Sequence, residues 1–185
     1  MTLEKISVRQ LFSLQPERFD EYNDVLKNVL SKSETNGKEA VDIYSLPFSD
    51  VAWLKEFIQE TNFENFVKAF DMVFGLTKSD FLKLDVVNFY QAFNWIQIQI
   101  LELIEGEKRL SSETDPELKE AGIEEMAIFG DLNTLISIGK DFGKSPDEVE
   151  KWIYSMVFAL SLHNTMSSEI SKRHQKIISK RDGNS

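Results

Sequence analysis

The chain of 185 residues contains no cysteine, only eight glycines and only four prolines. The absence of cysteine excludes disulfide bonds, thiolate nucleophiles and cysteine-ligated zinc sites. So few glycines and prolines do not suit the many tight turns of an all-β fold, and the composition therefore favours long helices. With 42% hydrophobic and 11% aromatic residues, the chain can still form a sizeable core.

The sequence also predicts no secretory signal and no apolar segment of the kind that spans a membrane. Residues 1–5 contain no apolar run that a signal peptide would require. The longest uncharged run, Val86–Leu101, contains five amide side chains: Asn88, Gln91, Asn94, Gln97 and Gln99. Amides are costly to place in lipid. We therefore predict no membrane span and no contact with a membrane.

Charge is distributed unevenly along the chain. Residues 171–185 hold Lys172, Arg173, Lys176, Lys180 and Arg181 against Asp182, a net charge of +4, whereas the total is −10 and residues 1–170 therefore carry −14. An acidic body argues against broad nucleic-acid binding, because phosphate contacts need a basic surface. The basic end could contact nucleic acid or an acidic partner, or it could be a solvated helix end whose cations favour the helix dipole.

The uncharged run lies within a predicted helix that extends from about Ser79 to Leu110. Apolar residues recur in it at alternating spacings of four and three: Leu82, Val86, Phe89, Phe93, Ile96, Ile100 and Leu103. Others fall near the opposite side of the same helix: Leu84, Val87, Trp95 and Ile98. A helix that is apolar on two sides must be enclosed by other elements. Nine of the 14 phenylalanines lie between Phe48 and Phe93, and we expect them at the centre of the core.

Capping and turn residues predict the other elements. Helices are expected to begin at Ser7, at Pro16, at the capping-box pattern Thr61–Glu64 and at Asp115, and to end at Gly75, Gly130 and Gly143. We expect a loop over Ser31–Glu39, an extended segment over Ile43–Phe48 and a helix from Pro116 to about Phe129. We find no internal repeat of fixed period. Together these features predict an all-α single domain, residues 1–185, of six to eight helices around the long helix at 79–110.

The last helix is predicted to begin at the capping box Ser145–Glu148 and to continue without a break past Ile177. Its apolar positions continue at the same spacing into a more polar set: Val149, Ile153, Met156, Leu160, His163, Ser167, Ile170, His174 and Ile177. The helix ends in the basic tail at 171–185, which could be mobile.

Residues suited to catalysis are scarce. The only histidines, His163 and His174, share a helix face but are separated by about 16 Å along the axis, so they cannot bind one metal together. Glu102 is the one candidate for acid–base chemistry because it borders the apolar run, yet a solvated helix end explains it more simply. We find no nucleophile elbow and no phosphate-binding glycine pattern. We therefore predict no enzymatic activity, no catalytic residue, no metal and no cofactor.

A series of residues in the C-terminal half follows a recognisable order. It comprises Ala92–Ile96, Glu107, Leu110, Ala121–Glu124, Phe129, Gly130, Thr134, Leu135, Tyr154, Val157 and Phe158. This part of the chain resembles structural-module proteins, involved in tail and neck assembly, of tailed bacteriophages and prophages of Bacteroidetes. The resemblance implies a virion-assembly role without catalysis, either as a tail-assembly chaperone or as a helical subunit of the neck or tail.

The resemblance also implies the partners and the location. We expect other phage structural proteins as partners, or further copies of the chain, either in the host cytoplasm during assembly or in the virion. The partner-binding residues expected on the last helix are Ile170, Lys172, Arg173, Ile177, Lys180 and Arg181. An alternative is an acidic helical regulatory protein that binds a host factor. A helical enzyme for a small ligand, with Glu102 buried in a pocket, is a third.

Overall fold

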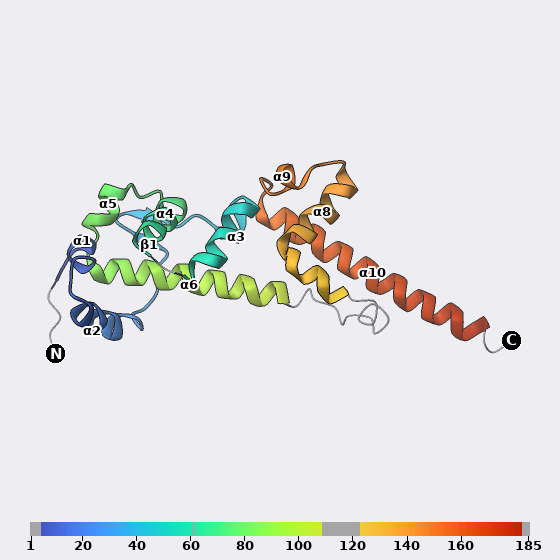
Figure 1. Cartoon of the computed structure of the whole chain (residues 1–185), viewed down its shortest axis with the longest axis horizontal. Coiled ribbons are helices and arrows are strands. Elements are labelled where there is room, and N and C mark those ends of the chain that lie inside the picture. Colours follow the sequence, from blue (N-terminus) through green and yellow to red (C-terminus); the bar gives the residue numbers. More distant parts are fainter. Residues whose placement is uncertain (1–4, 61, 109–122, 183–185) are drawn as a thin grey trace. The chain divides into compact units, whose positions relative to one another are not determined.

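The computed structural model describes residues 5–60, 62–108 and 123–182, and almost all of their regular structure is helical (Figure 1). Within these ranges there are nine α-helices, two short 3-10 segments and one two-stranded hairpin. The predicted all-α class is confirmed. The chain divides into two compact units: the first consists of Met1–Ile43 and Trp53–Leu103, and the second of Tyr44–Ala52 and Ile104–Ser185.

The first unit contains most of the aromatic core. Its elements are α1 (Val8–Leu11), α2 (Pro16–Leu26), β1 (Glu34–Thr35), β2 (Lys38–Glu39), the end of α3 (Phe48–Phe57), α4 (Phe63–Phe74), α5 (Lys78–Lys83) and most of α6 (Val86–Lys108). Phe89 of α6 is 2% exposed, and its ring lies 5.2 Å from that of Phe66 and 5.5 Å from that of Phe70. The phenylalanine-rich region therefore forms the core of this unit, as predicted.

The amide side chains of α6 have structural partners. Asn94 donates from Nδ2 to the carbonyl oxygens of Lys27 and Val29, at 3.1 and 2.9 Å. On the same helix, the backbone carbonyl of Gln91 accepts a hydrogen bond from the backbone N–H of Lys32 at 3.0 Å. The predicted loop at 31–39 then forms the β1–β2 hairpin, which pairs Glu34 with Glu39 in antiparallel register. These contacts with α6 thus fix the segment that connects α2 to this hairpin.

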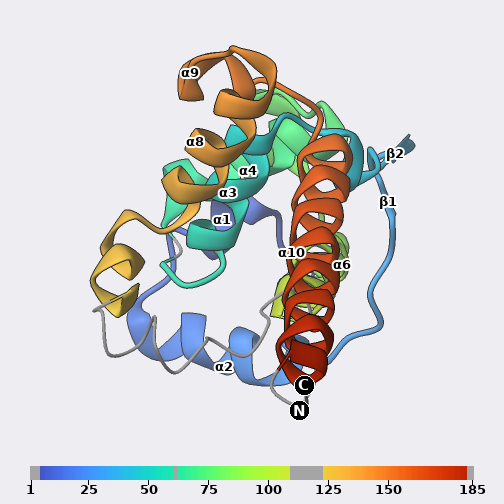
Figure 2. The same cartoon turned by 90° about the vertical axis from the view of Figure 1, so that its right-hand side faces the viewer.

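The second unit is built from shorter helices and one long one. Its elements are the first part of α3, the end of α6, the 3-10 segment η2 (Ile123–Phe129), α8 (Asp131–Phe142), α9 (Pro146–Val149) and α10 (Tyr154–Asp182). The predicted helix at Pro116–Phe129 is a 3-10 segment over its last part, Ile123–Phe129, and its beginning lies outside the described residues. In Figures 1 and 2, α8 and α9 lie beside the first turns of α10, and the later turns extend past them.

The predicted continuous helix at 79–110 is wrong at its beginning, because Leu84 is extended, with ψ of 140°, and separates α5 from α6. The backbone N–H of Val8 donates to the Leu84 carbonyl at 2.9 Å, and the N–H of Val86 donates to the Ile6 carbonyl at 3.0 Å. These bonds form a β-bridge between Ser7 and Asp85. The N-terminal segment therefore satisfies backbone groups that a continuous helix would have bonded internally. Residues 109 and 110 lie outside the described residues.

The last helix is interrupted in the same way. It was predicted to run unbroken from Ser145, but α9 ends at Val149 and α10 begins at Tyr154. The N–H of Phe48 donates to the Trp152 carbonyl at 2.9 Å, and the N–H of Tyr154 donates to the Leu46 carbonyl at 2.8 Å. The resulting bridge pairs Pro47 with Ile153. The expected extended segment before α3 is partly confirmed, since a 3-10 turn at Ile43–Ser45 precedes this bridge.

The two interrupted helices belong to a structural repeat. The helices α4 and α8 begin at residues 63 and 131, α5 and α9 at 78 and 146, and α6 and α10 at 86 and 154. The number of residues between the two starting points is the same in all three pairs. The bridged residues Asp85 and Ile153 are separated by the same interval. The prediction of no fixed-period repeat is therefore wrong at the level of the backbone. The repeat is hard to see in the sequence, because from 62 to 93 only four positions are identical at this interval: Asn65/Asn133, Phe74/Phe142, Gly75/Gly143 and Lys83/Lys151.

The repeat extends to the helix caps. Gly75 and Gly143 end α4 and α8 with φ of 62° and 63°, a left-handed conformation that glycine adopts at little cost. Thr77 and Ser145 then cap α5 and α9, each accepting a hydrogen bond from a backbone N–H three residues later. The same backbone path is thus specified twice by similar cap residues. Elsewhere in the repeat few residues are identical.

The capping box of α9 predicts a measurable pH effect. The Glu148 carboxylate accepts from the backbone N–H of Ser145 at 3.0 Å and from Lys144 Nζ at 2.9 Å, and these bonds lower the pKa of Glu148 from 4.5 to about 2. A lowered folded-state pKa contributes stability above pH 4.5 that is lost as the pH falls towards 2. We expect a carboxyl-detected NMR titration to place the Glu148 midpoint near 2. A midpoint near 4.5 would contradict this hydrogen-bonding arrangement.

The expectation that no helix crosses a membrane agrees with the structure. Within residues 5–60, 62–108 and 123–182, no helix combines the length and the apolarity needed to cross a lipid bilayer. Even the long helices α6 and α10 do not meet that condition.

Candidate functional site

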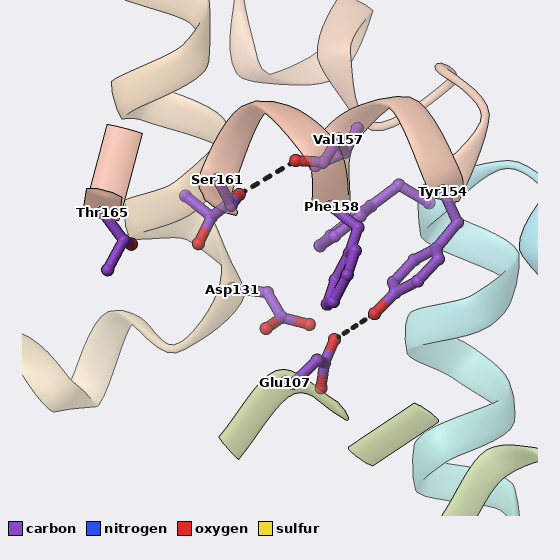
Figure 3. Close-up of a pocket in the computed structure, with 9 residues that line it drawn as sticks. Glu107, Asp131, Tyr154, Val157, Phe158, Ser161 and Thr165 are labelled. Carbon is purple, nitrogen blue, oxygen red and sulfur yellow. Dashed lines mark hydrogen bonds between the residues drawn. The ribbon is translucent and has the colours of Figure 1, made fainter. Parts of the chain in front are cut away.

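A pocket of about 310 Å³ lies between α8, α10 and the end of α6 in the second unit (Figure 3). It is lined by Phe48, Glu107, Asp131, Thr134, Tyr154, Val157, Phe158, Ser161 and Thr165. Aromatic rings form part of its wall, and Tyr154 stacks on Phe48 with ring centroids 5.9 Å apart. The remaining lining groups are mainly hydroxyls and two carboxylates, so the pocket is mixed in polarity.

Tyr154 and Glu107 form the main polar contact of this pocket. The buried Tyr154 hydroxyl donates to Glu107 Oε1 at 2.7 Å (Figure 3). Burial, and secondly this hydrogen bond to a carboxylate, raise the pKa of Tyr154 above its usual value of 10. The phenol therefore keeps its proton and remains the donor in this hydrogen bond. Its role is to tie the start of α10 to the last turns of α6 within this unit.

The internal repeat explains why this space is open. Thr134 and Ser161 occupy the positions that Phe66 and Phe93 occupy in the first unit, one repeat interval earlier. There the two phenyl rings meet with centroids 5.0 Å apart and fill the space between α4 and α6. Small hydroxyl side chains cannot fill the corresponding space between α8 and α10. The pocket is thus where the second unit lacks the aromatic packing of the first.

The chemistry available to the described residues is limited. No group of three or more histidine, aspartate or glutamate side chains among them could hold a metal ion. His163 and His174 are exposed on α10 and do not line the pocket. Glu102 is also exposed and accepts a hydrogen bond from Gln99 Nε2 at 3.2 Å. The pocket can therefore bind a group by shape and hydrogen bonding, and the absence of enzymatic activity stays a prediction.

The predicted partner-binding residues all belong to α10. Ile170 and Ile177 are 56% and 52% exposed, although isoleucine usually lies in the interior. Arg173 is exposed and donates from Nε to the Glu169 carbonyl at 3.3 Å, and Lys172 is half-buried. Lys180 and Arg181 are in the last turns of the helix, and their side chains lie outside the described residues.

Two further residues extend this surface and were missed in the sequence. Leu162 and Met166 are 38% and 53% exposed. With Ile170 and Ile177 they follow spacings of four, four and seven residues, which places all four side chains on one face of the helix. We call these four residues the α10 stripe. In the sequence the regular spacing passes through the neighbouring positions Leu160, His163, Ser167 and His174, so the pattern predicts only the second half of the stripe.

Known proteins offer no further guide to these two surfaces. Comparison of the chain with protein-family models, with curated proteins and with solved structures found no match.

Proposed function

We propose that this protein is a non-enzymatic assembly protein that acts through protein–protein contacts of α10. The observation that carries the proposal is the α10 stripe, four large apolar side chains exposed on one face of a 29-residue helix. In the setting that the C-terminal resemblance implies, the protein assembles a phage particle as a tail-assembly chaperone or as a helical subunit of the neck or tail.

The dimensions of the stripe support this role. From Leu162 to Ile177 it extends over about 22 Å at roughly 1.5 Å per residue. Single scattered apolar side chains on a surface need no explanation, but several large ones along one helix face are typical of a surface that binds another protein. When a helix binds in a groove or against a second helix of another protein, its anchoring apolar side chains recur at such spacings. The basic residues from Lys172 to Arg181 add a charged region at one end of the row.

A co-expression experiment tests the proposal directly. The chain is produced together with phage tube, neck and tape-measure proteins, and co-purification is measured for the double variant Ile170→Lys with Ile177→Lys. We expect at least a tenfold loss of the bound partner, since two charges would have to be buried in the contact. Mass spectrometry of finished particles then separates a subunit, which remains in them, from a chaperone, which does not.

The matched control is the double variant Ile98→Lys with Leu101→Lys on α6, where the side chains are 43% and 56% exposed. It introduces the same charges at apolar positions of similar exposure outside the stripe. Co-purification should be unchanged in this control. Equal loss in both variants, or no loss in the stripe variant, would overturn the assignment of α10 as the binding element.

A further inference from the structure

We infer that the first unit binds a small, uncharged aromatic molecule that carries one hydrogen-bond donor. The site is a pocket of about 250 Å³ between α2, the start of α4 and α6. Five phenylalanines, two asparagines and Tyr90 line it. The inference goes beyond the proposed function and does not depend on it, because no residue of α10 lines this pocket.

The structural repeat presents a pocket at this place in both units. Four residues that line the pocket of the first unit have equivalents, one repeat interval later, that line the pocket of the second. The pairs are Phe66/Thr134, Phe89/Val157, Tyr90/Phe158 and Phe93/Ser161. In the first unit the phenyl rings fill the space between α4 and α6, and the pocket lies between these rings and α2. The two linings differ in polarity, so the two pockets suit different ligands.

The lining of the first pocket favours an uncharged aromatic ligand. Only Tyr90 among the lining residues can ionise, and its pKa, which burial raises from 10 to about 12, is far above neutral pH. A charged ligand would therefore lose its hydration without gaining an opposite charge, which is costly. An aromatic ligand can pack against the phenyl rings edge to face or in an offset stack, and both arrangements are favourable.

The volume of the pocket limits the ligand to one or two rings. A cavity of roughly 150 Å³ with an apolar lining holds a molecule of benzene. Pockets for drug-sized ligands begin at about 300 Å³. At about 250 Å³, this pocket is intermediate and fits a ligand of the size of indole.

Tyr90 provides the polar contact for the ligand. It is 4% exposed, and its hydroxyl donates to Asn23 Oδ1 at 3.4 Å, longer than the roughly 2.7–2.8 Å that is usual for such bonds. Among the described residues, no group donates a hydrogen bond to the Tyr90 hydroxyl oxygen. A buried hydroxyl oxygen can accept one, and buried polar groups are rarely left without partners. The ligand therefore donates an N–H or O–H to Tyr90.

Isothermal titration calorimetry of the full chain with indole tests the site. We expect one indole per chain with a dissociation constant on the order of 100 μM, because the affinity of so small a ligand is limited by its few atoms. Benzofuran has an ether oxygen in place of the N–H of indole, so it should bind at least about fivefold more weakly. No binding of indole at concentrations on the order of 10 mM would overturn the inference.

The variant Tyr90→Phe tests the hydrogen bond. It removes only the hydroxyl, and the long bond to Asn23 contributes little to the fold. Indole should then bind as weakly as benzofuran, while the affinity for benzofuran should not change. If Tyr90 had only a structural role, the variant would change the binding of both ligands alike. An unchanged affinity for indole would overturn the assignment of Tyr90 as the acceptor.

The variant Asn23→Trp tests the location. Asn23 is exposed on α2, so the substitution leaves the core intact and tethers an indole ring beside the pocket. A ring tethered at an effective concentration of about 1 mM should weaken the binding of free indole about tenfold. The matched control is Asn28→Trp, because Asn28 is also exposed but does not line the pocket. Equal losses in both variants, or no loss in either, would place indole elsewhere on the chain.

N-acetyltryptophanamide distinguishes a free molecule from the side chain of a protein partner. It carries the indole ring on a peptide-like backbone, for which a pocket of this size has no room. We therefore expect it to bind at least about tenfold more weakly than indole. Binding as tight as that of indole would overturn the assignment to a free molecule and indicate a tryptophan side chain of a partner.

Discussion

Replacing Phe89 with alanine is expected to lower the free energy of unfolding by about 3–5 kcal/mol. The Phe89 ring is 2% exposed and packs against the rings of Phe12, Phe66, Phe70, Phe81, Tyr90 and Phe93. Truncation would leave a cavity that these neighbouring rings, fixed on α4, α5, α6 and the turn after α1, cannot close. Urea unfolding followed by circular dichroism measures the change.

The control is the same substitution at Phe129. Its ring is 46% exposed at the end of η2, so little buried area is lost and we expect a change of less than about 1 kcal/mol. The comparison isolates burial, because both variants lose the same atoms. Similar losses at the two positions would mean that the aromatic cluster is not the core of the first unit.

Replacing Gly139 with alanine is expected to destabilise the protein by about 2 kcal/mol. An alanine Cβ at this position would lie 2.5 Å from the Lys144 carbonyl oxygen, where the chain turns back after α8. The turn is held by the Lys144 N–H, which donates to the Gly139 carbonyl at 2.8 Å, so the backbone has little freedom to move away. The steric cost exceeds the gain of roughly 1 kcal/mol that alanine brings to a helix interior. Thermal unfolding measures the sum.

Gly106 is the matched position, since it is also within a helix but not against another backbone. A Cβ there would meet only Phe158 Cζ at 4.0 Å, an ordinary contact. Gly106→Ala should therefore stabilise the chain by about 0.5–1 kcal/mol. Opposite signs for the two variants are the expected result. A stabilising Gly139→Ala would show that the α8–α9 turn is looser than the structure indicates.

The candidate binding surface was predicted in part. Ile170 and Ile177 were found because a run of regular spacing continues there into polar sequence. Leu162 and Met166 were missed, since they lie on the face beside that run and nothing in the sequence says which face of α10 contacts α8. The pocket could not be predicted, because its openness depends on Thr134 and Ser161 lying opposite one another across two helices.

The repeat shows a related limit of sequence patterns. Ile96, Ile100 and Leu103 of α6 are almost completely buried, whereas the equivalent positions of α10, one repeat interval later, are Asn164, Ser168 and Ser171. The same backbone path therefore carries an apolar face in one unit and a polar one in the other. Hydrophobic periodicity in a sequence indicates which positions are buried. It could not reveal this repeat, because equivalent positions of α6 and α10 differ in burial.

Local chemistry in the sequence determined the helical class, most helix boundaries and the left-handed ends at Gly75 and Gly143, because caps and turns depend on residues within one turn of each other. Tertiary structure alone decided where the two long helices break. At Leu84–Asp85 and at Trp152–Ile153 the periodicity favours a continuous helix. The backbone there pairs instead with segments around Ser7 and Pro47, which are distant in sequence and supply hydrogen bonds that only the folded chain brings within reach.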